Sequence, residues 1–261
     1  MKRLFYLGAA VVVSSWFVMG MDCGARPNDL NLRFLVVDNG ASVKLMWDDV
    51  EEATHYIVYR DDELMDTLGP DSTEYLVDST MVGKQFKVVA EGARMEGALD
   101  LAPVVDSFVI GEYDNDASVG SGFYFDTDGL CYTLNLKADS SAWPRAQAVL
   151  MDDVADSVNP ATMQLMSGSA SGVNRLHTGF AAITGDYAPT VDTTDSAFAY
   201  AETQSASGVF EYAMWIDADN FAWNSTDHFV RLLATNVDYN TGSISVRYAY
   251  QTAPGLRWLP W

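Results

Sequence analysis

Apolar and polar side chains alternate with a period of two in several short stretches of this chain. Val43, Leu45 and Trp47 are separated by single residues that face the other way, and residues 56–60 repeat the alternation. A period of two is typical of β-strands that bury one face. The chain is therefore expected to fold as β-structure.

Turn residues separate such stretches at the spacing expected of a β-sandwich. Seven strands are predicted between residues 29 and 104, at residues 30–36, 43–47, 55–60, 64–68, 74–77, 84–90 and 98–104. Their inward positions predict a core of Leu32, Phe34, Val43, Leu45, Trp47, Tyr56, Val58, Tyr75, Phe86, Val88 and Ala90.

Three of these blocks together resemble a fibronectin type III module of secreted bacterial proteins. Trp47 matches the tryptophan of the second strand, residues 56–61 match the third strand, and residues 83–90 match the sixth. Phe86 stands where that family has a tyrosine, which keeps the packing and removes a hydroxyl. The resemblance implies a scaffold that presents surfaces and rarely carries out chemistry.

Residues 105–261 differ in composition, with more Gly, Ser, Ala, Thr and aromatic residues. Strand-like runs occur at residues 108–112, 122–125, 131–136, 146–151, 179–183, 197–201, 209–216, 229–235 and 243–250. Residues 159–162 allow the start of a short helix, but no stretch sustains a period of 3.6. The expected fold is a larger antiparallel β-sandwich or open barrel, with the apolar residues 256–261 tucked onto it.

The front of the chain predicts export. Two basic residues precede an uncharged run, which is too short for a spanning helix and is typical of a signal peptide. We therefore predict a signal peptide at 1–25, a sandwich at 26–104 and a second β-domain at 105–261, without a transmembrane helix in the mature chain. The expected location is extracellular or in the cell envelope. Cleavage after Gly20 or after Ala25 fits the small-residue rule.

Cys23 follows the apolar run at the place where bacterial lipoproteins are acylated, although Asp22 departs from their motif. Cys23 is either a lipid anchor or part of the leader. Cys131 is then a lone thiol in an apolar strand, and the chain offers no disulfide framework.

The net charge of the chain makes some classes of binding partner unfavourable. The chain has 36 acidic and 15 basic residues, a net charge of −21. Such a field disfavours nucleic acids and anionic lipid surfaces.

Catalytic motifs are missing from the sequence. The three histidines lack zinc spacing, and neither Ser121 nor Ser167 has the strand–serine–helix context of a nucleophile elbow. We therefore expect no enzymatic activity. His177 and His228 could meet as ligands of haem or a metal, because this half faintly resembles haem-binding β-proteins of bacterial envelopes, although structural histidines are the commoner case.

Calcium is the cofactor to which the sequence points most directly. Aspartates two residues apart resemble the start of a calcium loop, but none continues to a closing glutamate, and the same residues serve ordinary turns. The candidate ligands are Asp114, Asp116, Asp126, Asp128, Asp217 and Asp219.

Aromatic residues of the second half could form a sugar-stacking face or simply pack inside. They include Tyr124, Trp143, Tyr212, Trp215, Trp223 and Trp258. Trp223 lies in a polar segment and is the residue expected on a binding surface.

These observations predict a non-enzymatic secreted or cell-surface protein for recognition, adhesion or envelope assembly, whose partner is another envelope protein or a glycan. A carbohydrate-binding accessory protein and a haem- or ligand-capturing envelope lipoprotein are the alternatives.

Overall fold

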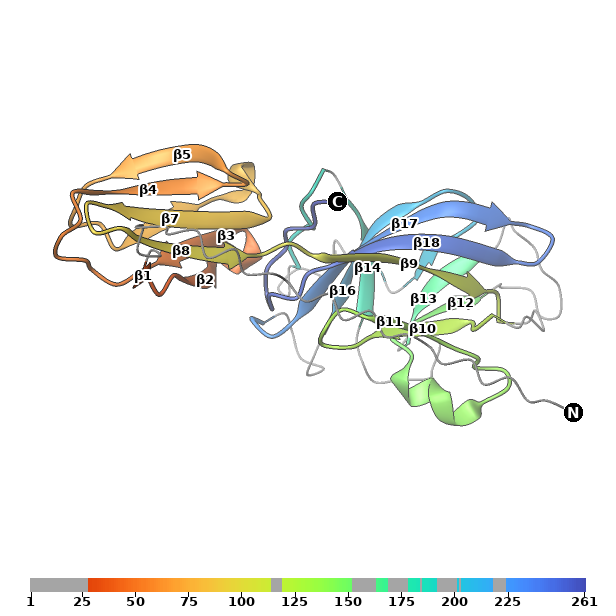
Figure 1. Cartoon of the computed structure of the whole chain (residues 1–261). Coiled ribbons are helices and arrows are strands. Elements are labelled where there is room, and N and C mark those ends of the chain that lie inside the picture. Colours follow the sequence, from red (N-terminus) through yellow and green to blue (C-terminus); the bar gives the residue numbers. More distant parts are fainter. Residues whose placement is uncertain are drawn as a thin grey trace, which may run out of the picture.

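The structure, a computed structural model, describes residues 28–113, 119–151, 163–168, 178–183, 185–191, 201, 203–217 and 224–261. Strands and short 3-10 turns make up its regular structure, which confirms the predicted all-β fold. The leader, the helix expected at residues 159–162 and most of the strand expected at 197–201 lie outside these ranges. Two sandwiches lie one after the other, and the last residues of the chain lie near the place where they meet (Figure 1).

The first sandwich consists of a five-stranded and a three-stranded sheet. The larger sheet has the order β1 (Asn28–Asp29), β8 (Met95–Asp100), β7 (Gln85–Glu91), β4 (His55–Arg60) and β5 (Glu63–Leu68). The smaller sheet has the order β2 (Arg33–Val37), β3 (Ser42–Met46) and β6 (Glu74–Val77). All neighbours are antiparallel except β1 and β8.

Alternation places the predicted core between these sheets. Eight of the eleven predicted residues are fully buried, while Leu32, Phe34 and Tyr75 are half-buried against them. Trp47 is 2% exposed, its indole N–H donates to the Ser72 carbonyl at 2.9 Å, and its ring lies 5.4 Å from that of Tyr56.

The last predicted strand of this sandwich, residues 98–104, was placed too late. The observed strand β8 covers Met95–Asp100, and β9 (Val104–Gly111) already belongs to the second sandwich. Gly97 occupies an inward position of β8, where a Cβ atom would lie 2.6 Å from the Cβ of Leu32. Because the inward residue Gly97 has no apolar side chain, the start of β8 lacks the alternation of apolar and polar residues that predicts a strand.

The second sandwich consists of two five-stranded sheets. One sheet has the order β14 (Thr178–Ala182), β16 (Glu211–Ile216), β17 (His228–Asp238), β18 (Ser243–Tyr250) and β9. The other has the order β11 (Cys131–Leu134), β10 (Gly122–Phe125), β12 (Ala148–Met151), β13 (Gln164–Ser167) and β15 (Thr203–Ser205). Their inner faces enclose a core that includes Phe123, Phe125, Leu150, Val230 and Tyr248.

Within the described ranges, no helix has both the length and the apolar character needed to cross a membrane.

Candidate functional site

The segment that follows β18, residues 251–261, joins the two sandwiches and is called the joint below. Leu256 and Trp258 are fully buried in the core of the first sandwich, where the Trp258 ring lies 5.9 Å from that of Phe86. Leu259 is also fully buried, but it packs with residues of the second sandwich that include Trp215. The expectation that residues 256–261 are tucked onto the second domain is thus confirmed for Leu259, whereas Leu256 and Trp258 enter the core of the first sandwich instead.

Hydrogen bonds to the first sandwich fix this joint. The Trp258 indole N–H donates to the Ala41 carbonyl at 3.0 Å, and the Arg257 amide donates to the Gly40 carbonyl at 3.1 Å. Gly40 has a φ of 81°, and a Cβ atom there would lie 2.1 Å from the Gly255 carbonyl oxygen. Only glycine fits this approach of two backbone segments.

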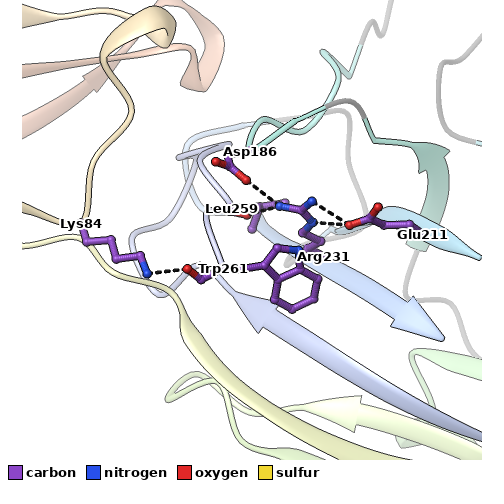
Figure 2. Close-up of polar contacts among 6 residues, drawn as sticks. All are labelled: Lys84, Asp186, Glu211, Arg231, Leu259 and Trp261. Carbon is purple, nitrogen blue, oxygen red and sulfur yellow. Dashed lines mark hydrogen bonds and ion pairs between the residues drawn. The ribbon is translucent and has the colours of Figure 1, made fainter. Parts of the chain in front are cut away.

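A buried arginine holds the end of the segment on the second sandwich (Figure 2). Arg231, which is 7% exposed, donates to Asp186 and to Glu211 at 2.7 Å each, and to the Leu259 carbonyl at 3.1 Å. Hydrogen bonds to two carboxylates and a carbonyl fix the orientation of the Arg231 guanidinium. Loss of one carboxylate would leave its buried positive charge only partly compensated.

The indole of Trp261 lies within cation–π distance of two guanidinium groups. Its ring centroid is 4.7 Å from Arg231 and 4.5 Å from Arg247, and Lys84 of the first sandwich donates to the main-chain oxygen of Trp261 (Figure 2). The final residues therefore contact both sandwiches through packing, hydrogen bonds and cation–π contacts.

A second notable surface is an aromatic stack on the outer face of β10 and β11. Tyr124 and Tyr132 are directly opposite each other in the two strands, and their rings stack at 5.1 Å with an interplanar angle of 15°. The Arg145 guanidinium lies 5.7 Å from the Tyr124 centroid. Tyr132 is 43% exposed, so the stack ends at solvent.

The 3-10 turn η3 (Ser140–Arg145) supports this stack from one side. Trp143 is half-buried, donates its indole N–H to the Leu136 carbonyl at 2.9 Å, and lies edge-on to Tyr113 at 5.3 Å. These aromatic residues pack on a small apolar cluster that includes Leu136 and Val149. The apolar cluster therefore supports Tyr124, on which the exposed Tyr132 stacks.

Two of the predicted calcium ligands lie in the turn between β10 and β11. The Asp126 carboxylate accepts the amides of Asp128 at 3.0 Å and Leu130 at 2.9 Å, which is the ordinary hairpin alternative. The negative charge of Asp126 and its hydrogen bond raise the pKa of Tyr132, and the charge of Asp128 adds a smaller shift in the same direction.

The other candidate sites are partly described. Asp217 is buried at 1% exposure, whereas Cys23, Asp114, Asp116, His177, Asp219 and Trp223 lie outside the described residues. Where the structure describes the chain, no three His, Cys, Asp or Glu side chains gather as a metal site requires. A calcium ion at these aspartates stays a prediction.

His228 is held by the fold of the second sandwich. Its Nδ1 lies 3.0 Å from the Gln251 carbonyl oxygen, and its ring stacks on Tyr250 at 5.2 Å.

The candidate aromatic residues divide into buried and half-buried positions. Trp215 is 7% exposed, with its indole N–H donating to Asp227 at 3.0 Å, and Trp258 is fully buried. Tyr124, Trp143 and Tyr212 are half-buried.

A pocket of about 260 Å³ lies on the outer face of β7 and β8, beside the Asp62 turn. Lys87 lines it, but its ammonium is 3.8 Å from the Asp62 carboxylate and 4.8 Å from the Tyr59 ring centroid. The charge of Lys87 thus has partners within the sandwich, which makes this pocket a weaker candidate than the aromatic stack.

Cys131 is expected to be an unreactive thiol. Burial raises its pKa strongly and the Asp106 charge adds to the effect, so little thiolate forms near neutral pH. In a chain that begins at residue 26, iodoacetamide should alkylate Cys131 slowly in buffer and rapidly in denaturant, as measured by mass spectrometry. Equal rates in both conditions would contradict this.

Sequence reasoning missed Tyr132 and the joint. The Asp-Gly turn contained only part of the signal for the first, because counting outward from a two-residue Asp128-Gly129 turn pairs residue 125 with residue 132, whereas the observed register pairs residue 124 with residue 132. The sequence signal for the joint was weak, because the apolar character of a segment does not show which of two cores buries it.

Searches against models of protein families, curated proteins and solved structures found no match to this chain.

Proposed function

We propose that this chain is a non-enzymatic secreted or cell-surface protein that works in recognition, adhesion or envelope assembly. The observation that carries the proposal is the joint formed by residues 251–261. Trp258 and Leu256 complete one core while Leu259 and Trp261 lie on the other sandwich. Two sandwiches held in a fixed arrangement present their outer surfaces at a defined spacing, which suits recognition of a partner.

We further propose that the first sandwich is a fibronectin type III module. Its support is a three-stranded sheet packed on four antiparallel strands, with Trp47 and Phe86 in the core. The short parallel strand β1 is an addition to that pattern. A scaffold of this kind serves many roles, and its outer surfaces determine which partner it binds.

Binding to the envelope of the producing cell tests the function. Labelled chain from residue 26 should bind washed cells or isolated envelope in a saturable way, and unlabelled chain should displace it. A heat-unfolded sample is the control for unspecific adhesion. The absence of any saturable binding to cells, envelope proteins or glycans would reject the proposed function.

The lipid anchor yields a separate prediction. If Cys23 is acylated, then Cys23→Ser should move the protein from the detergent phase to the aqueous phase in a partition assay of the expressed full chain. Cys131→Ser is the matched control and should not change partitioning, because Cys131 lies on the inner side of β11. Aqueous partitioning of the wild type would leave a freely secreted protein.

A further inference from the structure

The surface around the β10–β11 turn combines an exposed aromatic ring, an exposed aliphatic side chain and carboxylates. Tyr132 is 43% and Leu130 47% exposed. The charge of Asp126 and its hydrogen bond raise the pKa of Tyr132, and the charge of Asp128 adds to the shift. These four residues, Asp126, Asp128, Leu130 and Tyr132, are called the hairpin surface below.

The geometry of the tyrosine stack favours one more planar or cationic group. The order across the sheet is the Arg145 guanidinium, the Tyr124 ring and the Tyr132 ring. β11 is the edge strand of its sheet, so among the strands that the structure describes none pairs with it on the outer side of Tyr132. Among the described residues, Tyr124 is the only ring that stacks on Tyr132. The chain itself places a cation at the inner end of this stack, and the outer end offers the same kind of contact.

Charge selects the kind of partner. A tyrosine ring attracts cations through its quadrupole, and nearby carboxylates strengthen the attraction. Within the described residues, the Asp128 carboxylate forms no salt bridge with Lys or Arg, so its charge is available to a partner. The net charge of −21 also steers basic partners toward the chain and repels acidic ones.

We propose that the hairpin surface binds a basic segment of a partner protein, with an arginine or lysine side chain on the outer face of Tyr132. Asp128 pairs with the cation, and Leu130 packs on the aliphatic part of the same side chain. This inference rests on the proposed recognition function and names the partner's chemistry.

The test uses the two-sandwich chain from residue 28 and a fluorescein-labelled peptide in which arginine alternates with glycine. Fluorescence anisotropy should show binding that weakens with added salt. Tyr132→Ala should weaken binding about fivefold, the range expected for one exposed cation–π contact. Tyr132→Phe should bind as the wild type does, because the ring face is kept. Asp128→Asn should weaken binding about threefold.

A matched control separates this surface from general attraction between an acidic protein and a polycation. Tyr239 is 50% exposed and lies in the turn between β17 and β18, so Tyr239→Ala should leave the affinity unchanged. Thermal melts of all variants check that each remains folded.

Three results of the peptide experiment would overturn the inference. They are equal binding by Tyr132→Ala and the wild type, equal losses for Tyr132→Ala and Tyr239→Ala, or binding of a matched glutamate peptide. Retardation by a neutral polysaccharide gel that depends on Tyr132, without peptide binding, would assign the surface to a glycan instead. Envelope binding of the same affinity in Tyr132→Ala and the wild type would reject this inference and leave the recognition function standing.

Discussion

Replacing Trp258 by alanine is expected to destabilise the first sandwich by about 3–5 kcal/mol, although Trp258 follows the last strand of the second. Its side chain is fully buried against Phe86, and its indole N–H is bonded to the Ala41 carbonyl. The substitution leaves a large cavity between sheets that cannot collapse freely, and it removes a donor from a part-buried carbonyl.

Urea denaturation of the whole chain measures this effect. Tryptophan and far-ultraviolet signals should show an early transition for the first sandwich in Trp258→Ala and a smaller change for the second. Trp143→Ala is the matched control, because Trp143 is a half-buried tryptophan on the outer face of the second sandwich. It should leave the first sandwich unchanged. If Trp258→Ala and the wild type unfold the first sandwich at the same urea concentration, the joint is not part of its core.

The joint also explains how the two sandwiches depend on each other. A fragment that ends near residue 103 lacks Leu256 and Trp258, so its core is incomplete even though all its strands are present. Cooperative unfolding of the two sandwiches in the wild type follows from the same contacts, since ordering one stabilises the segment that fills the other.

Alternation predicted the strands best where one face is buried and the other is polar. The bounds of β4, β6, β10 and β18 agree with the sequence prediction, and the core positions of β3 and β4 were placed correctly. β13 and β15 escaped prediction, because the two buried residues of β13 are Leu165 and the polar Ser167, and β15 has only three residues in which to show a period.

The destination of the last segment could not be predicted from its own residues. Its apolar side chains required burial, but two cores were available and hydrophobicity is not directional. The selection comes from distant groups, namely the Gly40 carbonyl, the Ala41 carbonyl and the Arg231 guanidinium. Each is unremarkable in sequence.

The candidate surface was predicted in part for a similar reason. Aspartates spaced as Asp126 and Asp128 suggested a cation, yet a turn needs the same residues for its amides. What the sequence did not reveal was the exposed ring beside them, since the exposure of Tyr132 depends on β11 being at the edge of its sheet.

Replacing Trp47 by alanine is expected to cost about 3–5 kcal/mol of unfolding free energy. The ring is 2% exposed, lies against Tyr56, and donates to the Ser72 carbonyl. Trp47→Phe should cost less, because it keeps an aromatic ring and loses only the N–H donor. The loss should appear as a lower urea midpoint with an unchanged slope, since the surface exposed on unfolding is nearly the same.

The neighbouring residue provides the sharpest control for this prediction. Met46 precedes Trp47 directly, but it is half-buried on the other face of β3. If alternation along this strand decides which side chains hold the sandwich together, Met46→Ala should change stability by about 1 kcal/mol or less. The whole chain is needed for both measurements, because Leu256 and Trp258 complete the core that Trp47 occupies. Similar losses for Trp47→Ala and Met46→Ala would mean that burial on one face of β3 does not determine the stability of the first sandwich.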